Sequence, residues 1–219
     1  MSTVEQAPSR RAGRPRGPYA KTEEKRRAIL DAALEVFAKS GYRAGSIRDV
    51  AERVGMSEAG LLHHFPNKSA LLAAVLDRRD QHATEMVPLE DDDAPLVTLT
   101  GLLRLAAYNS SVPGVVELYC TLSAEATAPD HPAHDYFVRR YEWVRARLTR
   151  MFEKLEEQGS LQPGVRPASA ARSAVAMMDG LQVQWLLDRD SVDMAEELRD
   201  HFARLVTVEL VPIGDTEAP

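Results

Sequence analysis

Apolar side chains recur at intervals of three and four residues along most of this chain, and this spacing is typical of α-helices with one buried face. The first such stripe, residues 29–37, lies in a helix that we expect to begin with Thr22 as its N-cap and to stop at Gly41. Ser, Asn, Gly and Pro residues mark the ends of further helices. In chain order, the expected helices span residues 22–41, 46–54, 59–64, 68–81, 96–110, 114–128, 134–158, 167–188 and 192–210.

The longest apolar stripe belongs to the helix expected over 134–158, which Gly159 should terminate. Its members, spaced 4-3-4-3-4, are Phe137, Tyr141, Val144, Leu148, Met151 and Leu155. The acidic segment 88–95 is expected to be a solvated loop. The run 206–211 has some strand character, but we interpret it as the tail of the last helix because the sequence shows no convincing partner strand. The pattern therefore predicts an all-α fold.

Charge is distributed unevenly along the chain, and this changes what the net charge of −6 implies. Residues 1–80 contain 15 Lys and Arg against 10 Asp and Glu, a balance of +5. Residues 81–219 contain 12 against 23, a balance of −11. This asymmetry predicts that the N-terminal part meets a polyanion such as nucleic acid, which the remainder would repel.

The segment around the second and third expected helices has the spacing of a helix-turn-helix. Ala51 is small enough for two helices to cross closely, Gly55 supplies the positive φ that a three-residue turn needs, and Ser57 opens the next helix. The stretches GYRAGSIRDVAERVGMS, from Gly41, and LLHHFPNK, from Leu61, resemble the DNA-binding domain of the tetracycline-repressor (TetR) family. The close match covers roughly residues 22–80. The rest resembles that family only in length and in the number and placement of helices.

The resemblance implies a domain plan and a function. A three-helix DNA-binding domain is followed by a helical bundle that binds a ligand and dimerises, as in a repressor that grips a palindromic double-stranded operator. The expected segments are a disordered basic arm over 1–21, the DNA-binding domain over 22–80, the ligand-binding and dimerisation domain over 81–211 and a disordered tail over 212–219.

The resemblance also implies roles for individual residues. Arg48 matches a position that can reach a base edge. The exposed side of the third helix, which would enter the major groove, carries Glu58, Ala59, Gly60 and His63. The positions that match phosphate contacts are Ser46, Ser57, His64 and Lys68. The family often has Tyr in place of Leu62, whose side chain cannot bond a phosphate. Either a neighbouring His takes over this contact, or the two His residues merely pack beside Phe65.

The N-terminal stretch RRAGRPRG, from Arg10, resembles the core of an AT-hook. In that motif an extended Arg-Pro-Arg follows the narrow minor groove of A·T-rich DNA, which would place Arg14 and Arg16 against the bases. The alternative is a solvated basic tail with weak, non-specific affinity.

The helix expected over 167–188 is apolar nearly all round, so both of its sides must be covered. The chain's own core can cover one side, and a partner subunit can cover the other, in a homodimer formed through residues 167–210. The alternative is a central helix buried in a monomer. The resemblance places a small apolar or amphipathic effector inside the C-terminal bundle, where apolar bodies with a few polar tips suit a ligand cavity. The candidates are Tyr108, Tyr119, Tyr136, Trp143, Met177, Met178, Gln182 and Trp185.

Two other classes of function were weighed. A protein-interaction module without a small-molecule ligand would show a filled core and an exposed apolar groove in place of a cavity. The segment 130–135 (DHPAHD) resembles a metal or acid–base site, but Pro132 separates its His residues and no further ligand follows at a suitable spacing. We therefore expect a loop role there, no metal, no cofactor and no enzyme.

The remaining expectations concern location and redox chemistry. Cys120 is the one cysteine, and we interpret it as a small core residue in preference to a redox sensor. Without an apolar run of about 18 residues or a signal peptide, the chain is expected to be cytoplasmic and away from membranes.

Deleting residues 1–20 should weaken DNA binding and flatten its dependence on salt. The deletion removes four Arg residues, and each phosphate contact contributes about 0.9 to the slope of log K against log salt concentration. A titration at several salt concentrations would show a slope reduced by up to about 3.6. An unchanged slope would remove the arm from the binding mechanism.

Overall fold

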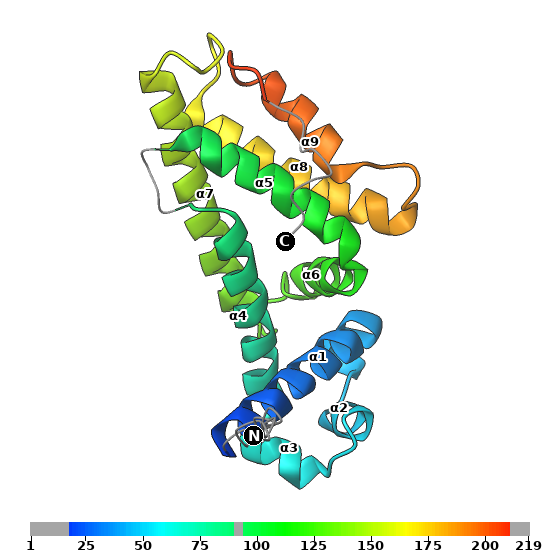
Figure 1. The fold of residues 1–219 in the computed structure, drawn as a ribbon. Coiled ribbons are helices and arrows are strands. Elements are labelled where there is room, and N and C mark those ends of the chain that lie inside the picture. Colours follow the sequence, from blue (N-terminus) through cyan, green and yellow to red (C-terminus); the bar gives the residue numbers. More distant parts are fainter. Residues whose placement is uncertain (1–17, 90–93, 211–219) are drawn as a thin grey trace, which may run out of the picture.

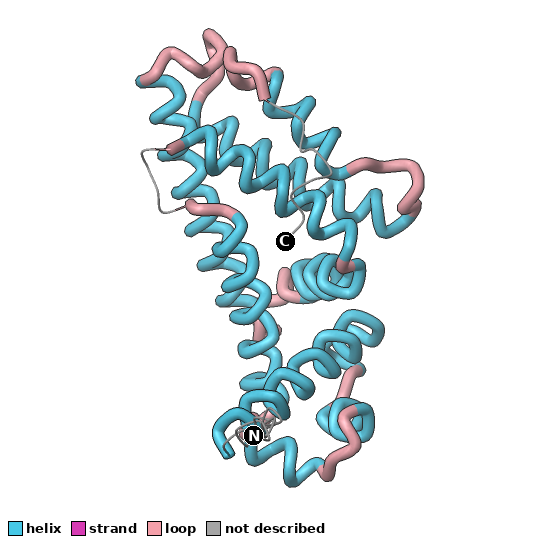
Figure 2. The backbone as a smooth tube through the Cα atoms, viewed as in Figure 1, coloured by secondary structure: helices cyan, strands magenta, loops and turns pink. Residues whose placement is uncertain are grey.

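The computed structural model describes residues 18–89 and 94–210, and for residues 18–21 only the backbone. These ranges fold into α-helices joined by short loops, which confirms the predicted all-α class (Figure 1, Figure 2). The helices are α1 (Pro18–Ala44), α2 (Ile47–Arg53), α3 (Glu58–His64), α4 (Lys68–Met86), α5 (Pro95–Ser111), α6 (Pro113–Glu125), α7 (His134–Glu157), α8 (Pro167–Leu187) and α9 (Met194–Ala203). Arg14 and Arg16, the acidic residues 90–93 and the expected tail 212–219 lie outside the described residues.

The helices form two groups. Helices α1, α2 and α3 lie at one end of the molecule, and α5, α8 and α9 pack together at the other (Figure 1). Helix α7 runs along α8, and α4 leads from the first group towards α5. Helix α6 packs against α1 and also contacts α8, so it lies between the two groups.

The short polar residues predicted to start helices do so. The Ser46 side chain accepts from the backbone N–H of Asp49, while the Asp49 side chain accepts from that of Ser46, which forms a capping box. Ser57 caps α3 and Asn67 caps α4, each by accepting a backbone N–H three residues ahead. These bonds replace backbone partners that the first turn of a helix lacks, so local sequence sets these boundaries.

Three predicted boundaries are wrong. Helix α1 begins at Pro18, ahead of Thr22, and proline suits a first helical turn because the N–H that it lacks would have no helical partner there. Helix α4 continues past residue 81 to Met86, since the burial of Ala83 extends its apolar face. Helix α9 ends at Ala203, well before 210.

Helix α9 ends early because the residues after it are extended and pair with another extended segment. Leu161 and Val206 form an isolated antiparallel bridge, with the N–H of Gln162 donating to the Leu205 carbonyl at 2.8 Å and the N–H of Thr207 to the Ser160 carbonyl at 2.9 Å. The β-branched run near Val206 suits this extended conformation better than a helix. Its interpretation as a helical tail is therefore wrong.

The apolar core has two parts. One fills the space among α5, α7, α8 and α9. The other joins the buried residues of α1–α4 to Leu118 and Leu122 of α6 and Phe137 of α7. The first four helices therefore do not close a core by themselves, because α6 completes it.

The end of α1 is shaped by its contact with α6. Regular helical geometry breaks at Gly41, where φ is 70° and ψ is 172°. The next residue, Tyr42, donates its backbone N–H to the Glu125 carboxylate at 3.0 Å. A Cβ added to Gly41 would overlap the Glu125 Oε1 atom. Glycine is needed here for its backbone conformation, and an added Cβ would also force the end of the Glu125 side chain to move.

Replacing Gly41 by Ala should lower the free energy of unfolding by about 2–4 kcal/mol, through backbone strain and the overlap with Glu125. Gly55→Ala is the matched control: its φ is 68°, but no atom lies within 4 Å of an added Cβ, so it should cost only about 1 kcal/mol. Urea unfolding at one protein concentration measures both. Adding Glu125→Ala to Gly41→Ala should cost less than the two single changes together. Equal losses in the two glycine variants would contradict the close approach.

Candidate DNA-binding surface and ligand pocket

Helices α2 and α3 form the predicted helix-turn-helix. Val50, Ala51 and Leu61 are buried between the helices. Gly55 turns the chain with φ of 68°, and the Met56 N–H closes the turn on the Ala51 carbonyl at 3.0 Å. This packing places α3 at the end of the molecule, away from the C-terminal helices (Figure 1).

The outer side of α3 carries the residues predicted to meet DNA. Glu58, Ala59 and His63 are exposed, and Gly60 is partly exposed. Leu62, which stands where the family often has Tyr, is also exposed, at 39%. These side chains form an accessible strip along one short helix.

The two histidines differ in exposure. His63 is exposed and His64 partly so, with their ring centroids 6.0 Å apart. Phe65 is buried, and the Arg26 guanidinium lies over its ring at 4.3 Å from the centroid. The face of Phe65 is therefore covered by Arg26 of α1.

Arg48 lies on α2, beside this strip. Its Nε donates to Glu52 Oε1 at 2.8 Å, one helical turn away, and both side chains are largely exposed. An exposed pair of this kind contributes only about 0.3–0.5 kcal/mol. The Arg48 guanidinium is thus held by a weak ion pair, and it can exchange Glu52 for a stronger hydrogen-bond acceptor.

The predicted phosphate-binding hydroxyls already serve as caps. Ser46 Oγ donates its hydrogen to Asp49 Oδ2 at 2.6 Å, and this bond lowers the pKa of the Asp49 carboxyl. Ser57 Oγ accepts from the Gly60 N–H at 3.1 Å, and its hydroxyl hydrogen is not donated to a carboxylate as that of Ser46 is. Of the two, Ser57 is the better placed to donate to an added anion.

Lys68 begins α4 and turns back towards the end of α1. Its Nζ donates to the Arg43 carbonyl at 3.2 Å and lies 4.3 Å from the centre of the Tyr42 ring. Partial burial lowers the pKa of this ammonium group. Lys68 therefore holds α4 against α1, and its charge remains next to the N-terminus of α4.

A cavity of about 70 Å³ lies in the C-terminal group, with walls from α4, α5, α6, α7 and α8. Four of the predicted ligand residues line it: Tyr119, Trp143, Met178 and Gln182. Its remaining surface is mostly aliphatic, with residues such as Leu102, Leu105 and Val175. A cavity of this size has room for little more than water, so a larger ligand requires its walls to move.

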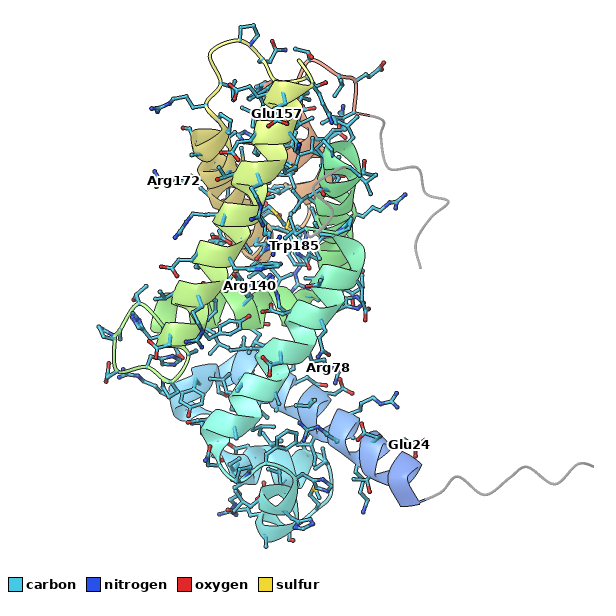
Figure 3. All side chains as sticks on the ribbon, turned by 90° about the vertical axis from the view of Figure 1, so that its left-hand side faces the viewer. Glu24, Arg78, Arg140, Glu157, Arg172 and Trp185 are labelled. Carbon is cyan, nitrogen blue, oxygen red and sulfur yellow. The ribbon has the colours of Figure 1, made fainter. Side chains whose placement is uncertain are left out.

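The other four predicted ligand residues lie elsewhere. Tyr108 lines a separate groove, and the Tyr136 hydroxyl donates to Asp80 Oδ2 at 2.8 Å. Met177 and Trp185 belong to the packed core, and Trp185 is only 5% exposed. Figure 3 shows Trp185 among the C-terminal helices, above Arg140.

One wall of the cavity carries charged residues that the sequence analysis did not single out. Arg79 of α4 and Arg140 of α7 both contact Asp80 Oδ1, at 3.1 and 3.0 Å. The Arg79 guanidinium also lies 4.0 Å from the centre of the Tyr119 ring. These contacts join α4, α6 and α7 by a network that is largely removed from water.

Asp179 of α8 completes this polar wall. It accepts from the Tyr141 hydroxyl at 2.8 Å. Burial raises the pKa of the Asp179 carboxyl, while the bond from Tyr141 opposes this shift. Burial likewise raises the pKa of the Tyr136 and Tyr141 phenols, so both donate as neutral hydroxyls. Asp179 is the only acidic residue of α8, and this is the sequence signal that could have identified it.

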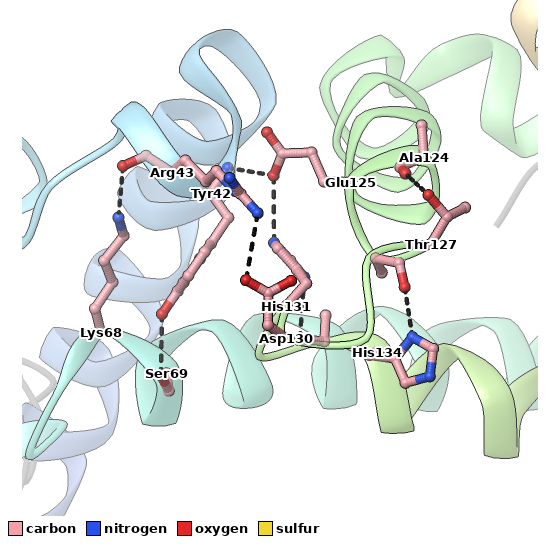
Figure 4. Close-up of polar contacts among 12 residues, drawn as sticks. Tyr42, Arg43, Lys68, Ser69, Ala124, Glu125, Thr127, Asp130, His131 and His134 are labelled. Atoms are coloured by element: carbon pink, nitrogen blue, oxygen red, sulfur yellow. Dashed lines mark hydrogen bonds and ion pairs between the residues drawn. The ribbon is translucent and has the colours of Figure 1, made fainter.

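The segment 130–135, which contains His131 and His134, joins the two groups of helices (Figure 4). The buried His131 ring accepts the Ala133 N–H at Nδ1, 3.2 Å away, and places Nε2 3.4 Å from Glu125 Oε2. His134 instead directs Nδ1 to the Ala126 carbonyl at 2.8 Å. The two rings thus have separate partners, and within the described residues no three His, Cys, Asp or Glu side chains group as metal ligands.

No helix of the described residues is both long and apolar enough to cross a membrane.

Two stretches of the chain match known families. Residues 29–75 match the family described as bacterial regulatory proteins, tetR family. Residues 117–210 match the family described as BetI-type transcriptional repressor, C-terminal. The first match contains the helix-turn-helix, and the second runs from α6 through α9.

Individual proteins are similar to this chain. The A-factor receptor protein of Streptomyces griseus is 26% identical over 182 residues, which are 82% of this chain and 62% of that protein. The HTH-type transcriptional regulator RutR of Escherichia coli K12 is 35% identical over 98 residues, which are 44% and 46% of the two chains. The chain thus spans less than two thirds of each. These relatives are regulators and receptors, not enzymes.

A solved structure gives a fuller match. The description of this structure concerns the molecular basis for control of antibiotic production by bacterial hormones. Its chain is 31% identical to this one, and the two structures align with a TM-score of 0.63. The match covers 84% of this chain and 98% of the other. Both groups of helices are therefore shared with that protein.

Cys120 should react slowly in the folded chain. Burial raises the pKa of its thiol to about 11, and only the thiolate attacks an alkylating agent. At pH 8 the rate of labelling by iodoacetamide should be on the order of a hundredfold lower in the native chain than in the urea-unfolded chain, whose thiol has an ordinary pKa. Cys120→Ser supplies the blank. Equal rates in the native and unfolded chains would show that the thiol is not protected.

Proposed function

The chain belongs to the tetR family of bacterial regulatory proteins, and on this premise we propose that it is a homodimeric repressor that releases a palindromic operator when a small molecule binds its C-terminal domain. Its role as a transcriptional regulator follows from the family. The observation that carries the rest is the exposed polar strip of α3, held outward by the turn at Gly55 and joined through α4 to a cavity with a charged wall.

Helix α3 is the element that enters the major groove. Glu58 and Ala59 at its start are exposed, so a carboxylate can accept from cytosine N4 and a methyl group can contact thymine. Gly60 allows close approach, and His63 adds a ring that can donate or accept. In a dimer, two such helices would meet successive turns of the operator, about 34–36 Å apart.

Arg48 reads a base from the adjacent helix. Exchanging the Glu52 carboxylate for the two acceptors of guanine costs little, because the existing ion pair is exposed. We assign the phosphate contacts to Ser57, His64 and Lys68. Among the described residues, the Ser57 hydroxyl has no acceptor for its hydrogen. Ser46 acts mainly through its capping box, since its hydrogen is donated to Asp49.

The effector enters the cavity behind α4. Charged and hydrogen-bonding groups on one wall and aliphatic groups on the others suit a small amphipathic molecule better than a protein surface. The similarity to a protein named the A-factor receptor, and to a structure whose description names bacterial hormones, supports a regulator that responds to a ligand. Because the present cavity is small, an effector must displace a wall. Helix α4 is the wall that leads directly to Lys68, so its displacement would reach the DNA-binding end.

Dimerisation uses α8 and α9. Val183 and Leu187 of α8 are 47% and 82% exposed, which is unfavourable for apolar side chains unless a partner covers them. Residues 167–210 therefore form the interface that we propose. The domain division is a DNA-binding domain over 22–80 and a ligand-binding and dimerisation domain over 81–211.

Selecting random double-stranded DNA with the purified chain should recover a palindrome, bound by a dimer and released by some members of a compound library. Arg48→Ala should then cost about 1–3 kcal/mol, confined to one base pair of each half-site, where the sequence preference should relax. Arg139→Ala, which removes an exposed arginine of α7, is the matched control and should bind like the wild type.

Two outcomes would count against this proposal. A uniform loss of affinity across sequences would make Arg48 a phosphate contact. A chain with no salt-sensitive affinity for duplex DNA, or one that sediments as a monomer at high concentration, would overturn the function as a whole.

A further inference from the structure

A second hollow lies between the two groups of helices. This groove measures about 350 Å³ and has walls from α1, α4, α5 and α6. The proposed effector cavity shares α4, α5 and α6 with it but is completed by α7 and α8 in place of α1. Leu34 of α1 and Val115 of α6 line it from opposite domains. Whatever occupies the groove contacts both the DNA-binding helices and the C-terminal helices at once.

Aliphatic and polar side chains both line the groove, and one polar group in it lacks a partner among the described residues. His82 of α4 places Nδ1 3.7 Å from Glu85 Oε2, and its Nε2 is buried without a hydrogen bond to any described residue. A hydrogen on Nδ1 faces the carboxylate and is favoured there. Nε2 then carries a lone pair, so the missing partner is a hydrogen-bond donor.

Two further residues define the shape and polarity of an occupant. The Tyr108 ring lies 4.6 Å from the His82 ring, centroid to centroid, and the pair forms an aromatic wall. Asn109 is only 5% exposed, and it lines the groove. It offers a second donor and acceptor to a molecule in the groove.

Both arginines that line the groove are already paired, and its one carboxylate among the described residues, Glu85, is largely exposed to solvent. Arg78 donates to Asp31 Oδ1 at 2.5 Å and to the Arg27 carbonyl at 3.4 Å, and Arg79 is held by Asp80. An anionic ligand would have to break one of these pairs, and a cation would meet two guanidinium groups. A neutral ligand avoids both costs.

We propose that this groove is a second binding site, for a neutral planar molecule of one or two aromatic rings that carries a hydroxyl group. The rings lie against Tyr108 and His82 and between Leu34 and Val115. The hydroxyl donates to His82 Nε2 and is within the region that Asn109 can reach. The site is separate from the effector cavity, so it does not depend on the function proposed above.

The test uses 2-naphthol as the probe and isothermal titration calorimetry of the full chain. Wild type should bind it saturably, and 2-methoxynaphthalene, which has the same rings but no donor, about three- to tenfold more weakly. His82→Phe keeps an aromatic ring but removes Nε2, so 2-naphthol should lose about three- to tenfold in affinity while the methoxy compound should change little.

Steric variants locate the site. Val115→Phe fills the groove and should weaken 2-naphthol binding more than tenfold. Val97→Phe, at a 55% exposed position of α5 that lines neither hollow, should leave it unchanged. Circular dichroism and thermal melting check that each variant is folded.

A variant of the effector cavity shows which of the two hollows holds the probe. Val175 lines the cavity but not the groove, so Val175→Phe should not affect 2-naphthol binding. Binding lost in Val175→Phe and retained in Val115→Phe would place the probe in the effector cavity, refuting the groove and leaving the proposed function intact. Absence of binding at millimolar 2-naphthol would refute the groove as well.

Discussion

The packing of α6 against α1 holds the DNA-binding helices to the C-terminal helices. Leu118 and Leu122 of α6 are fully buried in the core of the first four helices, and each such side chain stabilises the fold by about 1.5–3 kcal/mol. The Glu125 carboxylate accepts the Tyr42 N–H where α1 ends. The DNA-binding end therefore cannot move freely on a linker, because separating it from α6 would expose apolar surface and remove a hydrogen bond.

A second constraint acts through the charged wall. Arg79 is almost fully buried against Tyr119, and it shares Asp80 with Arg140. Removing one member of such a network leaves a buried charge, which typically costs about 3–5 kcal/mol. Helix α4 is thus tied to α6 and α7 by polar contacts and to α1 by packing. A displacement of α4 must carry these partners with it or exchange their bonds, which favours a small number of distinct arrangements over a continuous range.

The two hollows lie on either side of this connection. Both include Arg79, Ala83 and Leu105 in their walls, but one opens towards α7 and α8 and the other towards α1. A molecule in either one has contacts that depend on the position of α4. If a ligand and DNA each bind one position of α4 more tightly than another, binding of the ligand changes the affinity for DNA. The size of this change is at most the difference in the ligand's binding free energy between the two positions.

Features that depend on interactions among near neighbours can be predicted from the amino-acid sequence. Ala51, Gly55 and Ser57 define the helix-turn-helix within seven residues, and the caps at Ser46 and Asn67 each act across three. The apolar period of α7 likewise predicts its extent to within a residue. In each case the bonds and buried faces involved are set by the helix itself, so their residues can be recognised without knowing the fold.

Contacts between distant side chains, in contrast, depend on how the helices pack in three dimensions. Of the eight candidate ligand residues, Tyr119 and Gln182 line the cavity while Trp185 packs in the core, and nothing local to these residues distinguishes them. Residues 204–207 leave the helix because segment 160–162 offers backbone partners more than 40 residues away. Asp179 becomes part of a polar wall because Tyr141 lies opposite it on another helix. Such pairings come from packing between helices, and the periodicity of a single helix contains no information about its neighbours.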